Sequence, residues 1–176
     1  AIRRQRQLCI RDRFYAPKNM KKDNCEINLR PYCPSDCKTL LRLFCDTVRS
    51  VNAADYDEAQ IEAWTAGADV EKWNADFVES ETLVAEVNGV IAGFGNMYES
   101  GYFDRLYVSK DFLRCGVATA IADKLESGVC GKDITVHASV TAKPFFARRG
   151  YAVVKRQTVV RRGVPLTNFV MVKKRG

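Results

Sequence analysis

The sequence has little of what several common kinds of site require. Its 176 residues include one histidine, His137, and seven cysteines with no Cys-x-x-Cys pair, so neither a zinc site nor a Cys–His nucleophile is indicated. No apolar run approaches the roughly 18 residues of a membrane span, and the first segment lacks the apolar stretch of a signal peptide. These features predict a cytoplasmic protein with reduced thiols that binds neither a metal nor a membrane.

Positive charge is concentrated at the start of the chain. The formal net charge is +7, but residues 1–19 hold six Lys and Arg against a single Asp, a net +5 that leaves +2 for the rest. We predict that residues 1–19 are a disordered or artefactual basic tail, with Met20 as an alternative start, and that residues 20–176 form one domain. The domain itself gives little electrostatic reason to bind nucleic acid. A nucleic-acid-binding protein is the alternative if the tail is genuine.

The order of expected elements indicates an α/β fold. Alternating and apolar runs predict strands at 26–30, 82–87, 90–98, 102–108, 134–138, 151–160 and 166–172, and helical spacing predicts helices after Ser35 and Asp57 and over 116–127 and 141–149. Asn88-Gly89 is typical of a type I′ hairpin turn, and a second hairpin closes at Arg162-Gly163. A capping box joins Asp57 to Gln60, and Trp73 and Phe77 indicate a further short packed segment. The prediction is a mixed, mostly antiparallel sheet of about seven strands flanked by about four helices.

One turn has the features of a phosphate-binding site. The segment from Leu113 to Thr119 follows the apolar strand Leu106–Val108 and opens a helix, with Gly116 at the point where the backbone could approach a ligand closely. A helix N-terminus leaves about four N–H groups without intrahelical partners and carries about half a positive charge. The turn therefore favours a cofactor with a nucleotide tail. The alternative is an ordinary strand-to-helix turn that contains a glycine.

Two motifs carry a resemblance to a known family. The first is Q/R-x-x-G-x-G/A, represented by Leu113 to Ala118, and the second is A-x-x-F-Y-x-x-x-G-F/Y, represented by Ala142, Phe145, Phe146, Gly150 and Tyr151. With this element order, the chain resembles the GNAT superfamily of acetyl-CoA-dependent N-acetyltransferases over roughly residues 25–174. The resemblance implies acetyl-CoA as cosubstrate and a splayed parallel strand pair that admits its pantetheine arm as an extra strand.

The resemblance also implies a set of cofactor-binding residues. They are Leu106, Tyr107, Val108, Leu113, Arg114, Cys115, Gly116, Val117, Ala118, Thr119, Ser139, Phe145 and Phe146. Ser139 stands where the family often has a pantetheine-contacting asparagine, and an ordinary strand-end hydroxyl is the alternative. Two positions depart from the family pattern. Leu113 replaces the usual Gln or Arg, and Phe146 replaces a tyrosine that often protonates the departing thiolate. Tyr98 and Tyr107 are candidates to supply another hydroxyl, and packing or a surface role is the alternative for both.

The candidate catalytic residues are Asp104, Glu99 and Tyr98. Acetyl transfer needs a neutral amine, and a carboxylate acting directly or through water would accept its proton. Asp104, placed two residues before Leu106 on the same strand face, is the first choice. The alternative is a structural carboxylate that caps a turn or pairs with Arg105 or Arg49.

The acceptor is predicted to be a small-molecule primary amine. Asn52, Asp55, Tyr56 and Asp57 are expected to shape its pocket, and their acidic character would suit a cationic amine. A non-catalytic acyl-CoA-binding or sensing module of the same fold is the alternative function. Neither the acceptor's identity nor assembly as a homodimer is decided by the sequence.

Overall fold

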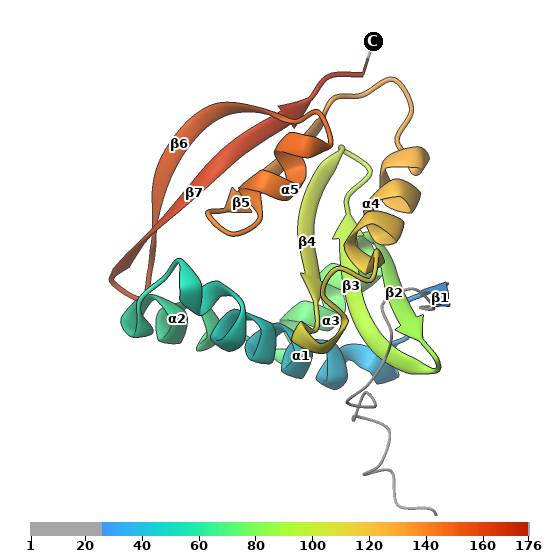
Figure 1. The fold of residues 1–176 in the computed structure, drawn as a ribbon, viewed down its shortest axis with the longest axis horizontal. Helices are drawn as coiled ribbons and strands as arrows, with labels where there is room; N and C mark the ends of the chain where they lie inside the picture. The colour runs from blue at the N-terminus through green and yellow to red at the C-terminus, as the bar shows by residue number, and fades with distance from the viewer. Residues whose placement is uncertain (1–25, 176) are drawn as a thin grey trace, which may run out of the picture.

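A mixed sheet of seven strands organises residues 26–175, which are the residues that this computed structural model describes (Figure 1). The strands are β1 (Ile27–Pro31), β2 (Glu81–Val87), β3 (Val90–Met97), β4 (Tyr102–Val108), β5 (Ile134–Ser139), β6 (Ala152–Arg161) and β7 (Val164–Lys173). Their order is β1-β2-β3-β4-β5-β7-β6, and every neighbouring pair is antiparallel except β4 and β5. The predicted fold class is confirmed, whereas the expected tail over residues 1–19 lies outside the described residues.

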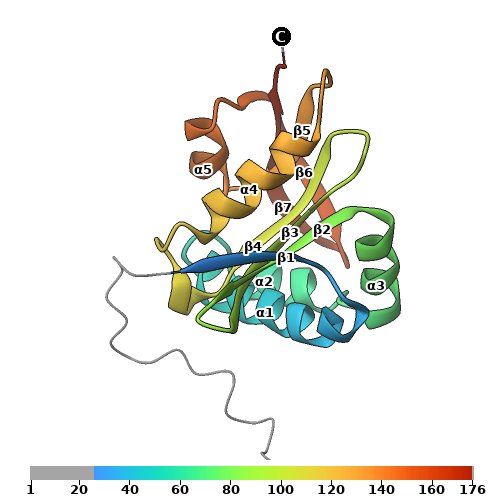
Figure 2. The ribbon, with the colours of Figure 1, turned by 90° about the vertical axis from the view of Figure 1, so that its right-hand side faces the viewer.

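Helices cover both faces of the sheet. Within residues 26–175 there are five α-helices, α1 (Cys37–Ser50), α2 (Glu58–Thr65), α3 (Val70–Glu79), α4 (Val117–Gly128) and α5 (Lys143–Arg148). Figure 2 shows α1, α2 and α3 on one side of the sheet and α4 and α5 on the other. The helix beyond the expected four is α3, which forms where only a short packed segment was predicted. No helix in the described part of the chain is long and apolar enough to span a membrane.

The predicted local signals occur at their expected positions. Asn88 and Gly89 both have positive φ angles of 52° and 77°, as a type I′ turn requires, and the turn at Arg162 and Gly163 repeats this geometry. At the start of α2, the Gln60 amide donates to the Asp57 carboxylate at 2.8 Å and the Asp57 amide donates to the Gln60 side chain at 3.1 Å. Both hairpins and the capping box are therefore confirmed.

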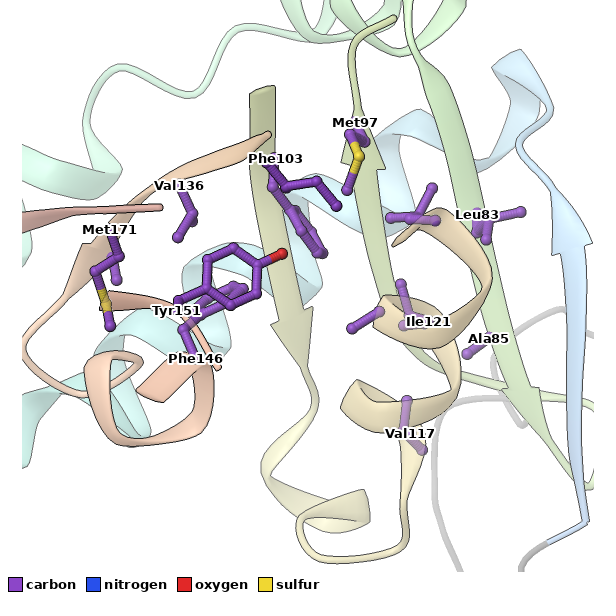
Figure 3. Packing of buried hydrophobic residues seen from close by; sticks show 14 of the residues in the cluster. Leu83, Ala85, Met97, Phe103, Val117, Ile121, Val136, Phe146, Tyr151 and Met171 are labelled. Carbon is purple, nitrogen blue, oxygen red and sulfur yellow. The ribbon is translucent and has the colours of Figure 1, made fainter. Parts of the chain in front are cut away.

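Two glycines allow α4 to lie directly against β3. A Cβ atom at Gly95 would come within 2.8 Å of Ile121 Cγ2, and one at Gly93 within 2.9 Å of Val117 Cγ1. Figure 3 shows Val117 and Ile121 directed from α4 into the buried cluster on this face of the sheet. This close approach fixes the first turn of α4 beside the end of β4.

A buried carboxylate ties α4 to the other half of the sheet. Glu126, 4% exposed, accepts hydrogen bonds from Arg149 Nε at 2.9 Å, from Lys173 Nζ at 2.7 Å and from the Tyr151 hydroxyl at 3.1 Å. Burial acts to raise the pKa of this carboxyl, but its bonds to Arg149 and Lys173 outweigh that effect and lower the pKa. Ionised Glu126 therefore holds α4 against β7 and the residues that follow α5.

Candidate functional site

The parallel strands β4 and β5 separate after a short paired segment. They are paired only at Tyr102 with Thr135 and at Phe103 with Val136, so the rest of each strand is free to diverge. A cleft of about 230 Å³ opens there, which we call the β4/β5 cleft. It is lined by Thr47, Val51, Asn52, Trp64, Phe103, Asp104, Arg105, Leu106, Tyr107, Val108, Leu113, Ala118, Val136, His137, Ala138, Ser139, Thr141, Ala142, Phe145 and Phe146. The splayed strand pair expected from the resemblance is confirmed.

Eight of the thirteen predicted cofactor-binding residues line this cleft. They are Leu106, Tyr107, Val108, Leu113, Ala118, Ser139, Phe145 and Phe146. The other five, Arg114, Cys115, Gly116, Val117 and Thr119, lie in the turn before α4 and in its first helical turn. Leu113 and Ala118, on either side of Gly116, line the cleft, so the turn lies next to it.

The turn before α4 directs several backbone amides to the start of the helix. Gly116 is the N-cap residue with a φ of 84°, and Arg114 also has a positive φ of 64°. The amide of Ala120 donates to the Gly116 carbonyl at 2.9 Å. The amides of Val117, Ala118 and Thr119 precede that bond, and they lie at the positive end of a helix of 12 residues. This end of the cleft is chemically suited to an anion.

Two predicted contacts have clear structural roles as well. The Ser139 hydroxyl oxygen accepts a hydrogen bond from the Ala142 amide at 3.0 Å, so it orders the loop between β5 and α5 while it lines the cleft. Phe146 is buried, with edge contacts to the rings of Phe103 at 5.5 Å and Tyr151 at 5.1 Å. Phe146 thus packs in the core and has no proton to donate.

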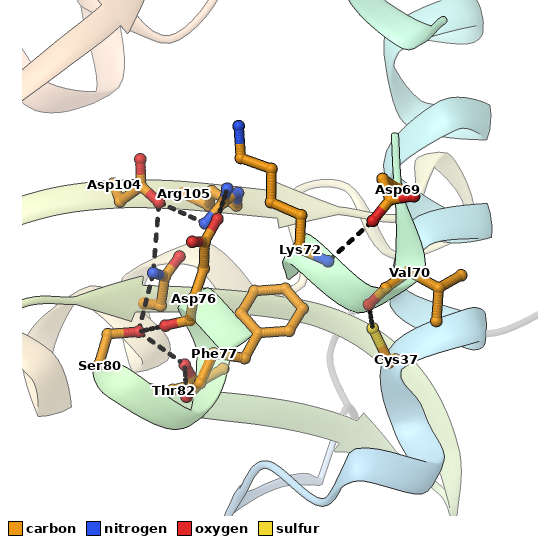
Figure 4. Close-up of polar contacts among 11 residues, drawn as sticks. Cys37, Asp69, Val70, Lys72, Asp76, Phe77, Ser80, Thr82, Asp104 and Arg105 are labelled. Carbon is orange, nitrogen blue, oxygen red and sulfur yellow. Dashed lines mark hydrogen bonds and ion pairs between the residues drawn. The ribbon is translucent and has the colours of Figure 1, made fainter. Parts of the chain in front are cut away.

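Asp104 lies in the wall of the cleft, in a bulged part of β4. The pairing of β3 with β4 shifts between Asn96 and Met97, opposite Asp104. One carboxylate oxygen of Asp104 accepts hydrogen bonds from Arg105 and from Asn96. Figure 4 shows the other oxygen pointing away from Arg105. Asp104 therefore forms the ion pair with Arg105 that was the alternative role.

The strand face expected for Asp104 was wrong. Leu106 packs against the cluster under α4 and α5, whereas Asp104 bonds Arg105, whose guanidinium carbon lies 4.5 Å from the ring centre of Trp73 in α3. The bulge is the cause, because the extra residue interrupts the alternation of faces along β4.

Glu99 and Tyr98 line a different cavity, of about 360 Å³, together with Glu79, Glu81, Met97, Gly128, Val129, Cys130 and Lys132. Neither residue lines the β4/β5 cleft. The Tyr98 ring stacks on that of Tyr102 at 6.3 Å, and the Glu99 carbonyl accepts a bond from Lys132. Of the three candidate catalytic residues, the structure brings Asp104 alone to the cleft.

Tyr107, which was predicted to bind the cofactor, keeps its phenol protonated at neutral pH because burial raises its pKa.

Other lining residues were not assigned to the site from the sequence. The Thr47 hydroxyl donates to the Val108 carbonyl at 3.1 Å and fastens the end of β4 to α1. His137, which the sequence singled out only as the lone histidine, lines the cleft from β5. These residues meet only in the folded chain, so local spacing gives no signal for them.

The residues between α1 and α2 brace the cleft through hydrogen bonds. The Asn52 side chain donates to Thr141 at 3.1 Å, and the Thr141 hydroxyl donates to Asp55 at 2.7 Å. The Tyr56 hydroxyl donates to the Thr167 carbonyl at 2.8 Å and accepts from the Val140 amide at 2.9 Å. Asp57 caps α2, as described above, and Asn52 is the one of the four expected pocket residues that lines the cleft.

Comparison with known proteins identifies the family. A sequence model described as the acetyltransferase (GNAT) domain matches residues 52–173. The chain belongs to the GNAT family. YafP of Escherichia coli K12, described as an uncharacterized N-acetyltransferase, is 38% identical over 145 residues, which are 82% of this chain and 94% of YafP. As a GNAT member, the chain is an acyltransferase with acetyl-CoA as its cosubstrate.

Solved GNAT structures share the fold. A GCN5-related N-acetyltransferase from Rhodopseudomonas palustris superposes with a TM-score of 0.80 at 36% identity, covering 88% of this chain and 98% of that one. The PaiA N-acetyltransferase of Thermoplasma acidophilum, solved in complex with coenzyme A, superposes with a TM-score of 0.67 at 18% identity. The match covers 85% of this chain and 99% of that one.

Proposed function

We propose that this protein transfers the acetyl group of acetyl-CoA directly to the primary amine of a small molecule. The observation that carries the proposal is the junction of three features in one cleft: the unpaired part of β4, the amide-bearing N-terminus of α4 and the carboxylate of Asp104. Together they provide a place for a linear thioester, for its diphosphate and for the proton of an attacking amine.

The donor fits this cleft by its chemistry. The diphosphate would accept hydrogen bonds from amides of the turn from Leu113 to Thr119, and amides of pantetheine would pair with the free edge of β4 as an added strand does. Leu113, where the family has Gln or Arg, removes a side-chain donor and leaves these backbone donors in place.

The transfer requires no acyl-enzyme. The amine nitrogen uses its lone pair to form a bond to the thioester carbonyl carbon, and a β4 amide near Leu106 to Val108 stabilises the oxyanion that develops. The carbon–sulfur bond then breaks and its electron pair leaves with the sulfur. Asp104 accepts the amine proton directly or through water, and the products are an N-acetyl amide and free coenzyme A.

Tyr107 is the proton donor to the leaving thiolate in this proposal. Its hydroxyl is protonated at neutral pH, it lines the cleft, and Phe146 at the usual family position has no hydroxyl. A thiol of ordinary pKa near 8.5 leaves as the thiolate at pH 7 at a cost of only about 2 kcal/mol, so this proton assists the reaction without being indispensable.

Turnover of acetyl-CoA with a panel of amines, amino acids, polyamines and peptides tests the function. We expect amine-dependent release of coenzyme A, with an acetylated small molecule found by mass spectrometry. Binding of acetyl-CoA without modification of any amine would instead support the non-catalytic acyl-CoA-binding module. Folded protein that gives no heat with coenzyme A or acetyl-CoA in calorimetry would contradict both functions.

A further inference from the structure

We infer that the acceptor amine also carries an anionic group, a carboxylate or a phosphate, which binds in a second cavity next to the β4/β5 cleft. The inference rests on the proposed acetyl transfer and adds to it the chemical class of the acceptor. The cavity, of about 330 Å³, is lined by Phe44, Ala63, Trp64, Gly67, Ala68, Lys72, Trp73, Asp104, Arg105, Tyr107, Arg161 and Arg162. We call it the cationic cavity.

The cationic cavity and the β4/β5 cleft share a wall. Trp64, Asp104, Arg105 and Tyr107 line both spaces. Three of these residues belong to β4, so a molecule in the cationic cavity would lie across that strand from the donor. An amine directed at this wall would meet the Asp104 carboxylate, which is the proposed proton acceptor.

Four cationic side chains and a single carboxylate line the cationic cavity. Arg105 is neutralised within the fold, because it pairs with Asp104 and, at 2.7 Å, with Asp76. The Arg162 guanidinium donates to the Ala66 carbonyl at 2.9 Å, a contact that leaves its charge uncompensated.

Lys72 and Arg161 have no carboxylate partner in the described part of the chain. Among residues 26–175, neither side chain takes part in an ion pair within 4.0 Å. In Figure 4 the Lys72 amine projects away from α3, while only its backbone amide bonds Asp69. The charge of Arg161 is also felt in this region, at the Tyr107 phenol. Burial raises the pKa of Tyr107, and the charges of Arg105 and Arg161 oppose that rise. Three positive charges thus converge without an internal counter-charge.

Placing these three positive charges close together does not stabilise the fold. Like charges repel, and a surface cavity lined by one sign of charge attracts a ligand of the opposite sign. Lys72 comes from α3, whereas Arg161 and Arg162 come from the end of β6 and its turn, so the three are assembled only by the fold. A carboxylate or phosphate bound between these elements would supply the missing negative charge.

The rest of the lining defines the other end of the acceptor. Phe44 and Trp73 are buried beneath the cavity, and their rings pack 4.8 Å apart, while Tyr107 contacts Phe44 at 4.9 Å. An apolar body would lie on this aromatic floor. The arrangement therefore selects an acceptor with an amine near Asp104 and an anion near Lys72, Arg161 and Arg162, and it replaces the purely cationic amine expected from the α1–α2 loop.

Matched acceptors test the inference. We would compare amino acids with the corresponding amino-acid amides, and aminoalkyl phosphates with the corresponding amino alcohols, at saturating acetyl-CoA. We expect kcat/KM to favour the anionic member of at least one series by about tenfold or more, because a hydrogen bond to a charged group contributes more than a neutral one. The preferred series assigns the anion. The preference should fall as salt is raised, because screening weakens the attraction.

Variants of the cationic residues test whether they bind the anionic group of the acceptor. Arg161→Gln and Lys72→Gln should each raise KM for the anionic acceptor by about tenfold, with kcat and the rate on the neutral partner little changed. Arg162→Asn removes the third charge with a residue that tolerates the positive φ of this turn. Lys155→Gln is the matched control, because Lys155 is an exposed cation on β6 that does not line the cavity.

The outcomes separate this inference from the proposed function. Equal turnover of the anionic and neutral members of both series, or an unchanged KM in Arg161→Gln and Lys72→Gln, would overturn the anionic acceptor and leave acetyl transfer standing. Failure to acetylate any amine at all would instead remove the proposed function and, with it, the inference.

Discussion

The β4/β5 cleft and the cationic cavity are built from different parts of the chain by different means. In the proposed function, phosphate recognition at the cleft depends on backbone amides of one contiguous segment, from Leu113 to Thr119, next to an unpaired strand. The cationic cavity depends on charged side chains from α3, β4 and the β6–β7 turn. Backbone donors survive a change of side chain, whereas a charged side chain does not. The proposed donor site can therefore be recognised from a sequence motif. The proposed acceptor site can be recognised only from the folded structure.

The largest expected effect is on the backbone site. Gly116→Glu should weaken acetyl-CoA binding about a thousandfold, since two like charges about 4 Å apart repel by about 4 kcal/mol at a protein surface. Calorimetry with acetyl-CoA measures the loss. Gly131→Glu is the matched control, because Gly131 also has a positive φ, of 65°, with no atom crowding its Cβ position. Equal affinity of the two variants would show that the diphosphate does not bind at the turn before α4.

The next largest effect is expected at Asp104, in the wall shared by the β4/β5 cleft and the cationic cavity. Asp104→Asn should lower kcat/KM by about a hundredfold at neutral pH, which is within the usual range for loss of a general base. The deficit should shrink as pH rises toward the amine pKa of about 10.4, because more acceptor is then already neutral. The pH–rate profile measures this.

Asp76→Asn serves as the control for Asp104→Asn. Asp76 also pairs with Arg105 but does not line either space. If the Asp104→Asn profile paralleled that of the unmodified protein, Asp104 would have no role as a base.

The smallest effect is expected at the proton donor. Tyr107→Phe should lower kcat about tenfold, since the thiolate can leave unprotonated at a cost of only about 2 kcal/mol. Adding Phe146→Tyr to that variant should restore part of the rate by returning a hydroxyl to the usual family position. Tyr98→Phe is the comparison, because Tyr98 lies outside the cleft. Steady-state kinetics in which Tyr98→Phe fell further than Tyr107→Phe would reassign the donor.

Local signals in the sequence predicted the strands, both hairpin turns and the turn before α4, because each depends on near neighbours. Residues 26–175 nevertheless contain a helix, α3, where only a short packed segment around Trp73 and Phe77 was predicted. Asp69 caps that helix by accepting from the Lys72 amide at 2.8 Å, and this N-cap was not predicted.

The position of Asp104 could not be predicted in the same way. Its face is set by a bulge against β3, which depends on the pairing of two strands and not on either strand's own pattern. The convergence of Lys72 with Arg161 has the same origin, since residues so far apart in sequence meet only through the order of strands in the sheet.

The phenol of Tyr56 joins the segment after β5 to β7. It bonds the backbone of Val140, just after β5, and that of Thr167 in β7, while its ring lies 5.2 Å from Trp64 in the shared wall. An acceptor that displaced Trp64 would therefore also displace Tyr56, whose hydrogen bonds hold the β5 end of the proposed donor site. Thermodynamic reciprocity then requires that whatever the first substrate does to the affinity of the second, the second does equally to the first.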